Sequence, residues 1–189
     1  MSEAYGTEVT EGQALIIRND WRDANSSIVQ LWMHTEKAAR NAISYSGKPF
    51  TAAKGTFRMV AGDLLFKLPS GRILSFPEAQ LRQGDRNAEI IYKGMNNHTH
   101  RWDEIKAYGG SIVQSITQAV ARDILAEAIL RLEAAQYPIV LHVHDEIVAD
   151  VPNDFGSLKE FERLMCVLPK WAEGMPVEAE GYESTRYRK

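Results

Sequence analysis

Apolar residues follow helical spacing in the first part of the chain. Ahead of them, Thr10 stands three positions before Gln13, which is the spacing of a capping box. A first apolar stripe contains Ala14, Ile17, Trp21 and Ala24, and a second contains Ile28, Leu31, Trp32, Thr35, Ala38, Ala39, Ala42 and Ile43. The pattern predicts two amphipathic helices that meet at Asn25 or Ser26. Aromatic residues in such stripes usually pack in a core, so Trp21 and Trp32 are expected to be buried.

From about Thr51 the apolar period changes towards two, which is typical of strands. Strands are predicted over residues 54–60, 64–68, 73–76, 89–93 and 102–107. Gly62-Asp63 is a hairpin-turn pair, residues 69–72 form a second turn, and residues 96–98 lie at the tip of the last strand pair. Basic side chains gather in this region: Lys54, Arg58, Lys67, Arg72, Arg82 and Arg86. They form either a solvated face or a set of phosphate contacts. His98 and His100 lie in a polar loop and are expected to be exposed rather than to bind metal.

After the break at residues 108–110, a long helix is predicted from about Ser111 to Ala135. Its apolar side contains Ile112, Ile116, Val120, Ile124 and Leu132. Gln114, Gln118 and Arg122 recur every four residues and therefore share one face. That face is either solvated or reads acceptors in the minor groove of a duplex, where all base pairs look similar. Glu127 and Arg131 are spaced for a local ion pair.

Two β-branched runs flank an acidic tip in residues 139–151. Branched side chains favour strands, and Pro138 and Pro152 bound the unit because proline lacks the amide that a ladder needs. The pattern predicts a hairpin with Asp145 and Glu146 at its tip. Acidic side chains in an apolar hairpin cost free energy unless they are paired or bind a metal, so this tip is the first candidate for a catalytic or metal-binding site.

The C-terminal part predicts one more helix and one more strand. The helical stripe contains Leu158, Phe161, Leu164, Met165 and Leu168, with Pro169 near its end. Cys166 lies within this helix and is expected to be a small buried hydrophobe. Residues 176–180 are predicted to form the last strand, and Arg186, Arg188 and Lys189 give a basic end.

Composition narrows the class of protein only slightly. The 189 residues are 44% hydrophobic and 25% charged, which is ordinary for a globular protein. The net charge of -3 does not by itself indicate a protein that binds nucleic acid. A single cysteine excludes an internal disulfide and favours a reducing compartment, the cytoplasm. No N-terminal signal and no apolar run of about 20 residues is present, so no membrane association is expected.

The order of these pieces resembles the C-terminal part of the family A DNA polymerases, the DNA polymerase I type, in their bacteriophage form. Residues 108–110 and 118–123 resemble the helix that precedes the family's motif C, and residues 141–146 resemble motif C itself. Residues 68–72 and 186–189 are also similar to segments of phage members. The resemblance runs from about Tyr5 to Lys189, and the fold it implies is α+β, a partial polymerase fold. In it, an antiparallel palm sheet carries the motif C hairpin and is flanked by helices.

The resemblance implies roles for individual residues. Asp145 is similar to the palm aspartate that binds catalytic Mg²⁺, Glu146 to its neighbour near the metal and the primer end, and His144 to the residue beside the primer terminus. Gln118 resembles the minor-groove glutamine, with Gln114 and Arg122 on the same helical face as further DNA-binding candidates. The implied reaction is two-metal nucleotidyl transfer in DNA replication, on primer-template DNA and deoxynucleoside triphosphates.

Parts of the family pattern are missing from this sequence. No acidic stretch resembles motif A, which carries the second metal-binding aspartate, and the chain is expected to begin just past the nucleotide-binding fingers helix and to lack the thumb. Residues 1–48 would then be the helical end of the fingers and residues 49–189 the palm region. We expect a split or truncated polymerase in a bacterial or phage-infected cytoplasm. It would be inactive alone and would need a complementing chain that carries motif A, the nucleotide-binding helix and the thumb.

Two other classes of function remain open at this point. One is a non-catalytic remnant of a polymerase palm that binds DNA or a replisome protein. The other is a metallohydrolase built on His142, His144 and Asp145, since a His-x-His pair on a strand places both imidazoles on one face and suits zinc. No second His-rich pair stands where it could complete such a site.

Overall fold

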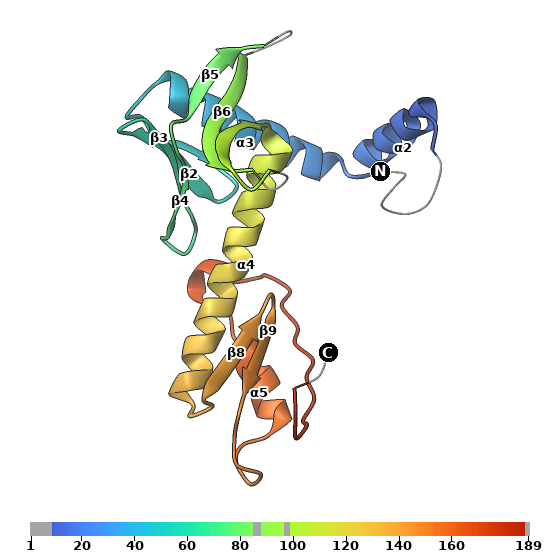
Figure 1. The fold of residues 1–189 in the computed structure, drawn as a ribbon, viewed down its shortest axis with the longest axis vertical. Coiled ribbons are helices and arrows are strands. Elements are labelled where there is room, and N and C mark those ends of the chain that lie inside the picture. The colour runs from blue at the N-terminus through green and yellow to red at the C-terminus, as the bar shows by residue number, and fades with distance from the viewer. Residues whose placement is uncertain (1–8, 85–87, 97–98, 188–189) are drawn as a thin grey trace. The chain divides into compact units, whose positions relative to one another are not determined.

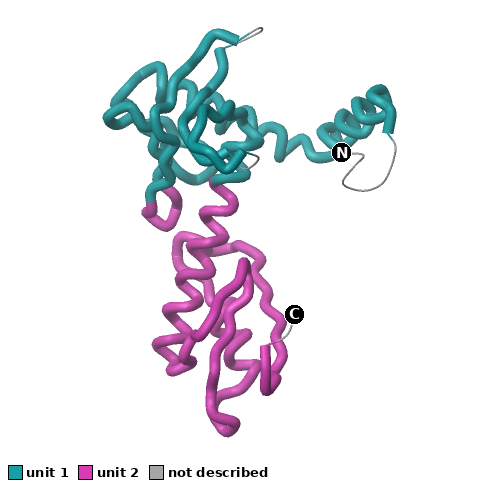
Figure 2. Tube along the Cα trace, in the orientation of Figure 1, with its two compact units in different colours: residues 1–67, 73–115 teal, residues 68–72, 116–189 magenta. Residues whose placement is uncertain are grey.

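The computed structural model describes residues 9–84, 88–96 and 99–187, and it divides into two compact units (Figure 2). Unit 1 comprises residues 1–67 and 73–115, and unit 2 comprises residues 68–72 and 116–189. Blocks of helices and blocks of antiparallel strands follow one another along the chain, which confirms the predicted α+β class (Figure 1). This division follows packing within the chain, whereas the predicted division at residue 48 concerns polymerase domains and stays a prediction.

Unit 1 begins with two helices, α2 (Glu11–Ala24) and α3 (Ser26–Ser44). The predicted capping box is present: the Thr10 hydroxyl accepts from the backbone N–H of Gln13, and the Gln13 side chain accepts from that of Thr10. Asn25 separates the helices and is the N-cap residue of α3 as predicted, but its side chain forms no capping hydrogen bond there. Its side-chain amide donates instead to the carbonyl of Trp21, so it closes α2.

Neither tryptophan is buried as predicted, since Trp21 is exposed and Trp32 is only half-buried. The Trp21 side chain is 44% exposed and stacks on Trp32, with ring centroids 5.6 Å apart. No residue of α2 is buried, whereas α3 buries Thr35, Ala38, Ala39 and Ala42. An apolar stripe shows which face of a helix avoids water, but it does not show that this chain covers that face.

Two antiparallel sheets complete unit 1. The first has the order β1-β2-β3-β4, with β1 at Phe50–Ala52, β2 at Gly55–Val60, β3 at Asp63–Lys67 and β4 at Ile73–Phe76. The second has the order β5-β6-β7, with β5 at Gln80–Gln83, β6 at Ala88–Met95 and β7 at Trp102–Ala107. The five predicted strands are confirmed within a few residues, and β1 and β5 were not predicted because they are too short to show alternation. Phe57, Leu64 and Phe66 fill the core beneath the first sheet.

Helix α4 (Gly109–Ala134) confirms the long predicted helix. Ile112, Ile116 and Leu132 of its apolar side are buried as predicted, but Val120 and Ile124 are only half-buried. The predicted pair of Glu127 with Arg131 is wrong, since the Arg131 guanidinium donates to the backbone carbonyl of Leu164. No helix among the described residues is both long enough and apolar enough to cross a bilayer.

The rest of unit 2 contains the hairpin β8 (Ile139–Val143) and β9 (Glu146–Ala149), the helix α5 (Leu158–Met165) and a short 3₁₀ turn, η1 (Lys170–Ala172). The hairpin is a sheet of two strands, so the larger sheet expected around it is not formed by the described strands. Cys166 follows α5 as its C-cap and is half-buried rather than buried.

The predicted strand over residues 176–180 is wrong, because the described tail after η1 contains no strand. Alternating apolar residues there are half-buried without a ladder partner: Val177 and Ala179. The tail is instead held by a side chain, since the backbone N–H of Gly181 donates to the Glu162 carboxylate, 2.8 Å away.

Candidate functional site

The acidic tip lies in a two-residue turn between β8 and β9. Val143 pairs with Glu146, so His144 and Asp145 are the loop residues. His144 has a φ of 55°, in the left-handed region that residues other than glycine seldom adopt. Such backbone conformations cost free energy and are found disproportionately at functional sites. The pairing of β8 with β9 confirms the predicted hairpin with Asp145 at its tip.

All three predicted tip residues are exposed: His144, Asp145 and Glu146. Both carboxylates therefore keep access to water and are open to a ligand from outside the chain. Glu146 accepts a hydrogen bond from the Tyr187 hydroxyl, with 2.9 Å between the oxygens. This hydrogen bond, together with partial desolvation and the negative charge, raises the pKa of the Tyr187 phenol above its ordinary value. Residues 186–189 resemble a segment of phage polymerases, but nothing in the sequence indicated that Tyr187 would bind Glu146.

The fit of a metal ion to this tip is partial. Among the described residues, no group of three or more His, Cys, Asp or Glu side chains is arranged to hold a metal. Asp145 and Glu146 provide two adjacent carboxylates, and Mg²⁺ in phosphoryl-transfer sites is often held by one or two carboxylates together with substrate phosphates. The chemistry of the tip thus suits part of a magnesium site whose other ligands come from elsewhere.

The metallohydrolase alternative required His142 and His144 to lie on one strand, and they do not. His142 lies on β8, but His144 lies beyond the end of that strand in the left-handed turn. The alternation that would place the two imidazoles on one face therefore stops at Val143.

Helix α4 presents the predicted polar face. Gln114, Gln118 and Arg122 are all exposed. Within the parts of the chain that the structure describes, none of them forms a hydrogen bond or ion pair through its side chain. These side chains keep their donors available for an external partner, as a DNA-binding role would require.

The basic region is divided between internal and external uses. Arg72 binds Asp123, Arg82 binds Glu104, and Arg58 donates to the carbonyl of Gly47. These three guanidinium groups serve the fold, so a phosphate role for the whole set is not favoured. Lys54 and Lys67 are exposed, as is His100, whereas Arg86, Asn97 and His98 lie outside the described residues.

The sequence of the chain is similar to that of a bacteriophage DNA polymerase. It is 37% identical to the DNA polymerase of Bacillus phage SP02, in a match over 189 residues that covers 98% of the chain. The chain spans only 29% of the length of that polymerase. The predicted resemblance to a piece of a bacteriophage DNA polymerase is thereby confirmed. No family model matches the chain, and no solved structure matches it.

Proposed function

We propose that this chain is a fragment or subunit of a family A DNA-directed DNA polymerase and supplies part of its nucleotidyl-transfer site. The observation that carries the proposal is the exposed Asp145, presented in a tight turn by a chain that matches a phage polymerase over nearly its whole length. A fixed turn presents the carboxylate with little conformational freedom to lose, which is what an electrostatic catalyst requires. The enzyme would work in the cytoplasm of a bacterium or a phage-infected host.

In this proposal the hairpin tip serves the primer end. Asp145 would hold Mg²⁺ with Glu146 beside it, and the bound metal would activate the primer hydroxyl and stabilise charge on the leaving pyrophosphate. His144 is next to Asp145 in the turn and would contact the primer terminus. Because these side chains are exposed, they can reach primer, triphosphate and metal without a rearrangement of the hairpin.

The polar face of α4 would bind the duplex. Gln114 and Gln118 can donate to minor-groove acceptors, which are arranged alike for all base pairs, and Arg122 can pair with a phosphate. Such contacts report the shape of a base pair rather than its identity. A mismatch would displace the acceptors and weaken the hydrogen bonds, so these residues would support accuracy at the primer end.

A complementing chain would carry motif A, the nucleotide-binding helix and the thumb. Most of the SP02 polymerase lies outside the match, and the two acids at the tip are fewer than two metal ions need. As expected for such a piece, α2 exposes large apolar side chains: Leu15, Ile16, Ile17 and Trp21 are 44%, 61%, 59% and 44% exposed. A helix of this length is marginal alone in water, so we assign this α2 surface to contact with the complementing polymerase chain.

Complementation tests the function directly. The SP02 polymerase with its matching segment deleted would be mixed with this chain, and extension of a labelled primer measured with Mg²⁺. Extension by the mixture, and by neither component alone, is the expected result. If the chain alone binds primer-template but the mixture does not extend it, the chain is instead a non-catalytic remnant that binds DNA or a replication protein. Absence of both extension and DNA binding would overturn the proposal.

The same mixture tests the α2 surface. Ile16→Glu should weaken association with the truncated polymerase by more than about tenfold, because a buried unpaired charge costs more than 1.4 kcal/mol. Arg18→Glu, two positions further on and therefore on the opposite side of the helix from Ile16, is the matched control and should have little effect. If ultracentrifugation shows that the chain forms a dimer that only Ile16→Glu disrupts, the surface binds a second copy and the assignment is wrong.

A further inference from the structure

The last described residue of the tail lies against the acidic tip. Tyr187 is 41 positions from Glu146 in sequence, yet its hydroxyl donates to the Glu146 carboxylate Oε2 across 2.9 Å. The tail leading to Tyr187 contains no helix or strand after η1. It is nevertheless tied to α5 by the hydrogen bond from Gly181 N–H to the Glu162 carboxylate. The contact at the tip is therefore made by a segment that side chains, rather than a ladder, hold in place.

Glu146 would otherwise be free to rotate. It is the first residue of β9 and is exposed, and among the described residues Tyr187 is its one side-chain partner. An exposed glutamate populates several rotamers, and ordering it when a ligand binds costs conformational entropy. A phenol that binds Oε2 restricts the carboxylate in advance and leaves Oε1 open.

We infer that Tyr187 is a positioning residue that fixes the Glu146 carboxylate at the hairpin tip. The inference deepens the proposed function, on which it rests, by adding the C-terminal tail to the nucleotidyl-transfer site. Hydrogen-bonded partners of a ligating carboxylate orient it and typically change metal affinity or activity on the order of 10–100-fold. Tyr187 acts through Glu146 and touches neither primer nor triphosphate in this scheme.

The contact itself can be tested on the chain alone. Tyrosine labelled with ¹³C at Cζ would be titrated by NMR, with Tyr187→Phe used to assign the Tyr187 signal. The signal should titrate at a higher pH than that of a free tyrosine, and Glu146→Gln should lower its midpoint because the negative acceptor is lost. An unchanged midpoint in Glu146→Gln would overturn the inference without bearing on the polymerase proposal.

The positioning role needs the complemented polymerase and a double-mutant cycle. Tyr187→Phe should lower kcat for nucleotide addition by about tenfold, with the KM for nucleotide and the affinity for DNA nearly unchanged. In the Glu146→Gln background the same substitution should have no further effect, because its target is already altered. Tyr45→Phe, at another exposed tyrosine, is the matched control.

The outcomes distinguish a failure of the positioning role of Tyr187 from a failure of the proposed nucleotidyl-transfer site. If Glu146→Gln lowers kcat but Tyr187→Phe does not, or if the two losses simply add, Tyr187 does not position Glu146. If neither Asp145→Asn nor Glu146→Gln lowers kcat, the proposed site is wrong and the inference fails with it. Circular dichroism of each variant would establish that the fold is kept.

Discussion

Arg72 and Asp123 form an ion pair in unit 2, with 2.5 Å between Nε and Oδ1. The Ser70 hydroxyl donates to the other carboxylate oxygen, and a second nitrogen of Arg72 donates to the backbone carbonyl of Ala119, 2.9 Å away. Asp123 is only 8% exposed, so its charge depends on these partners. The turn over residues 68–72 is thereby fixed to the part of α4 that carries Gln118 and Arg122.

Asp123→Ala should destabilise unit 2. The substitution leaves the Ser70 hydroxyl and the Arg72 guanidinium without their acceptor, but water screens the half-exposed arginine, so we expect a loss of about 1–2 kcal/mol in the free energy of unfolding. Urea unfolding followed by circular dichroism measures it. Glu104→Ala breaks the exposed pair with Arg82 and is the control, for which little change is expected. Equal effects of the two variants would contradict a structural role of Asp123.

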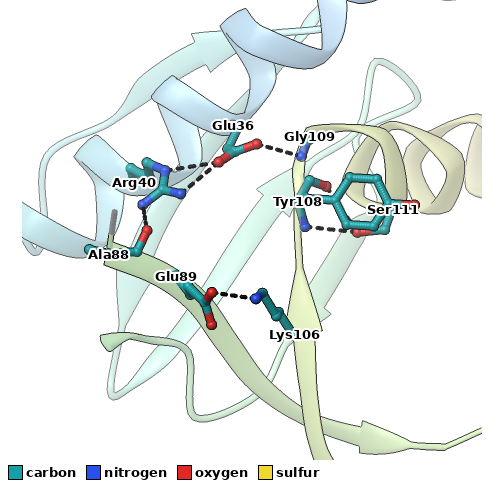
Figure 3. A network of polar contacts seen from close by, with 8 residues as sticks. All are labelled: Glu36, Arg40, Ala88, Glu89, Lys106, Tyr108, Gly109 and Ser111. Atoms are coloured by element: carbon teal, nitrogen blue, oxygen red, sulfur yellow. Dashed lines mark hydrogen bonds and ion pairs between the residues drawn. The ribbon is translucent and has the colours of Figure 1, made fainter. Parts of the chain in front are cut away.

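Gly109→Ala should destabilise unit 1, although alanine normally favours a helix. The backbone N–H of Gly109 donates to Glu36, which is also paired with Arg40 (Figure 3). A Cβ on Gly109 would lie 2.2 Å from the carbonyl oxygen of Trp32, a backbone atom that moves only with α3. We expect a loss of about 1–3 kcal/mol in the free energy of unfolding, as for other overpacked sites.

Gly12→Ala in α2 is the matched control for Gly109→Ala. A Cβ at this helical glycine meets nothing within 4 Å, so the substitution should stabilise the chain by up to about 1 kcal/mol. Opposite signs for the two glycines, measured by urea unfolding, are the expected result. If Gly109→Ala also stabilises the chain, the close approach of α3 to the start of α4 is not present in solution.

Stability should fall at alkaline pH through Tyr137. Its phenol is buried, donates to the Glu160 carboxylate and accepts from the backbone N–H of Ser157, and burial raises its pKa above its ordinary value. Because the folded pKa exceeds the unfolded value of about 10, the contribution is complete below that pH and is lost as pH rises through the folded pKa. The difference in free energy of unfolding between parent and Tyr137→Phe, measured from pH 7 to 11, should be constant at first and then shrink. A constant difference throughout would contradict the burial of this phenol.

Local patterns predicted the elements well because their causes are local. The capping box at Thr10, the alternation in β2 and β3 and the turn at residues 144–145 each depend on residues near one another in sequence. The predictions that failed depended on tertiary contacts, that is, on whether another part of the chain packs against the predicted element or pairs with it. Trp21 belongs to an apolar stripe and stays 44% exposed although it stacks on Trp32, and residues 176–180 alternate correctly but pair with no strand among the described residues.

In the candidate site, too, the features with local causes could be predicted and the long-range contacts could not. The place of Asp145 could be predicted because β-branched runs on both sides of it favour two strands joined by a turn, and the exposed face of Gln118 follows from helical spacing. The pair of Tyr187 with Glu146 and that of Arg72 with Asp123 join residues 41 and 51 positions apart. No short-range pattern contains such contacts. Arg72 was therefore grouped with the other basic side chains, although its guanidinium is occupied within the fold.

The chain alone should not extend a primer. Two adjacent carboxylates at an exposed turn bind Mg²⁺ weakly, because this ion keeps several waters and needs substrate phosphates or further acids to hold it. Primer extension with Mg²⁺ at increasing chain concentration is the measurement, with the complemented polymerase as the positive control. Robust extension by the pure chain would show that another acid of this sequence completes the metal site.

Asp145→Asn should abolish most turnover in the complemented polymerase while leaving DNA binding intact. The substitution keeps the size of the side chain but removes its charge, so a metal ligand becomes a poor one. By analogy with removal of other preorganised electrostatic groups, the rate of nucleotide addition should fall on the order of 10²–10³-fold or more. Affinity for primer-template should change little, because phosphate contacts dominate it.

Gln118→Ala is the contrasting variant and should weaken discrimination against a mismatched primer end more than it slows correct addition. Single-turnover addition and DNA binding at fixed salt measure both effects. If Asp145→Asn stays within a few-fold of the parent rate, Asp145 is not a metal ligand and the proposed mechanism is wrong.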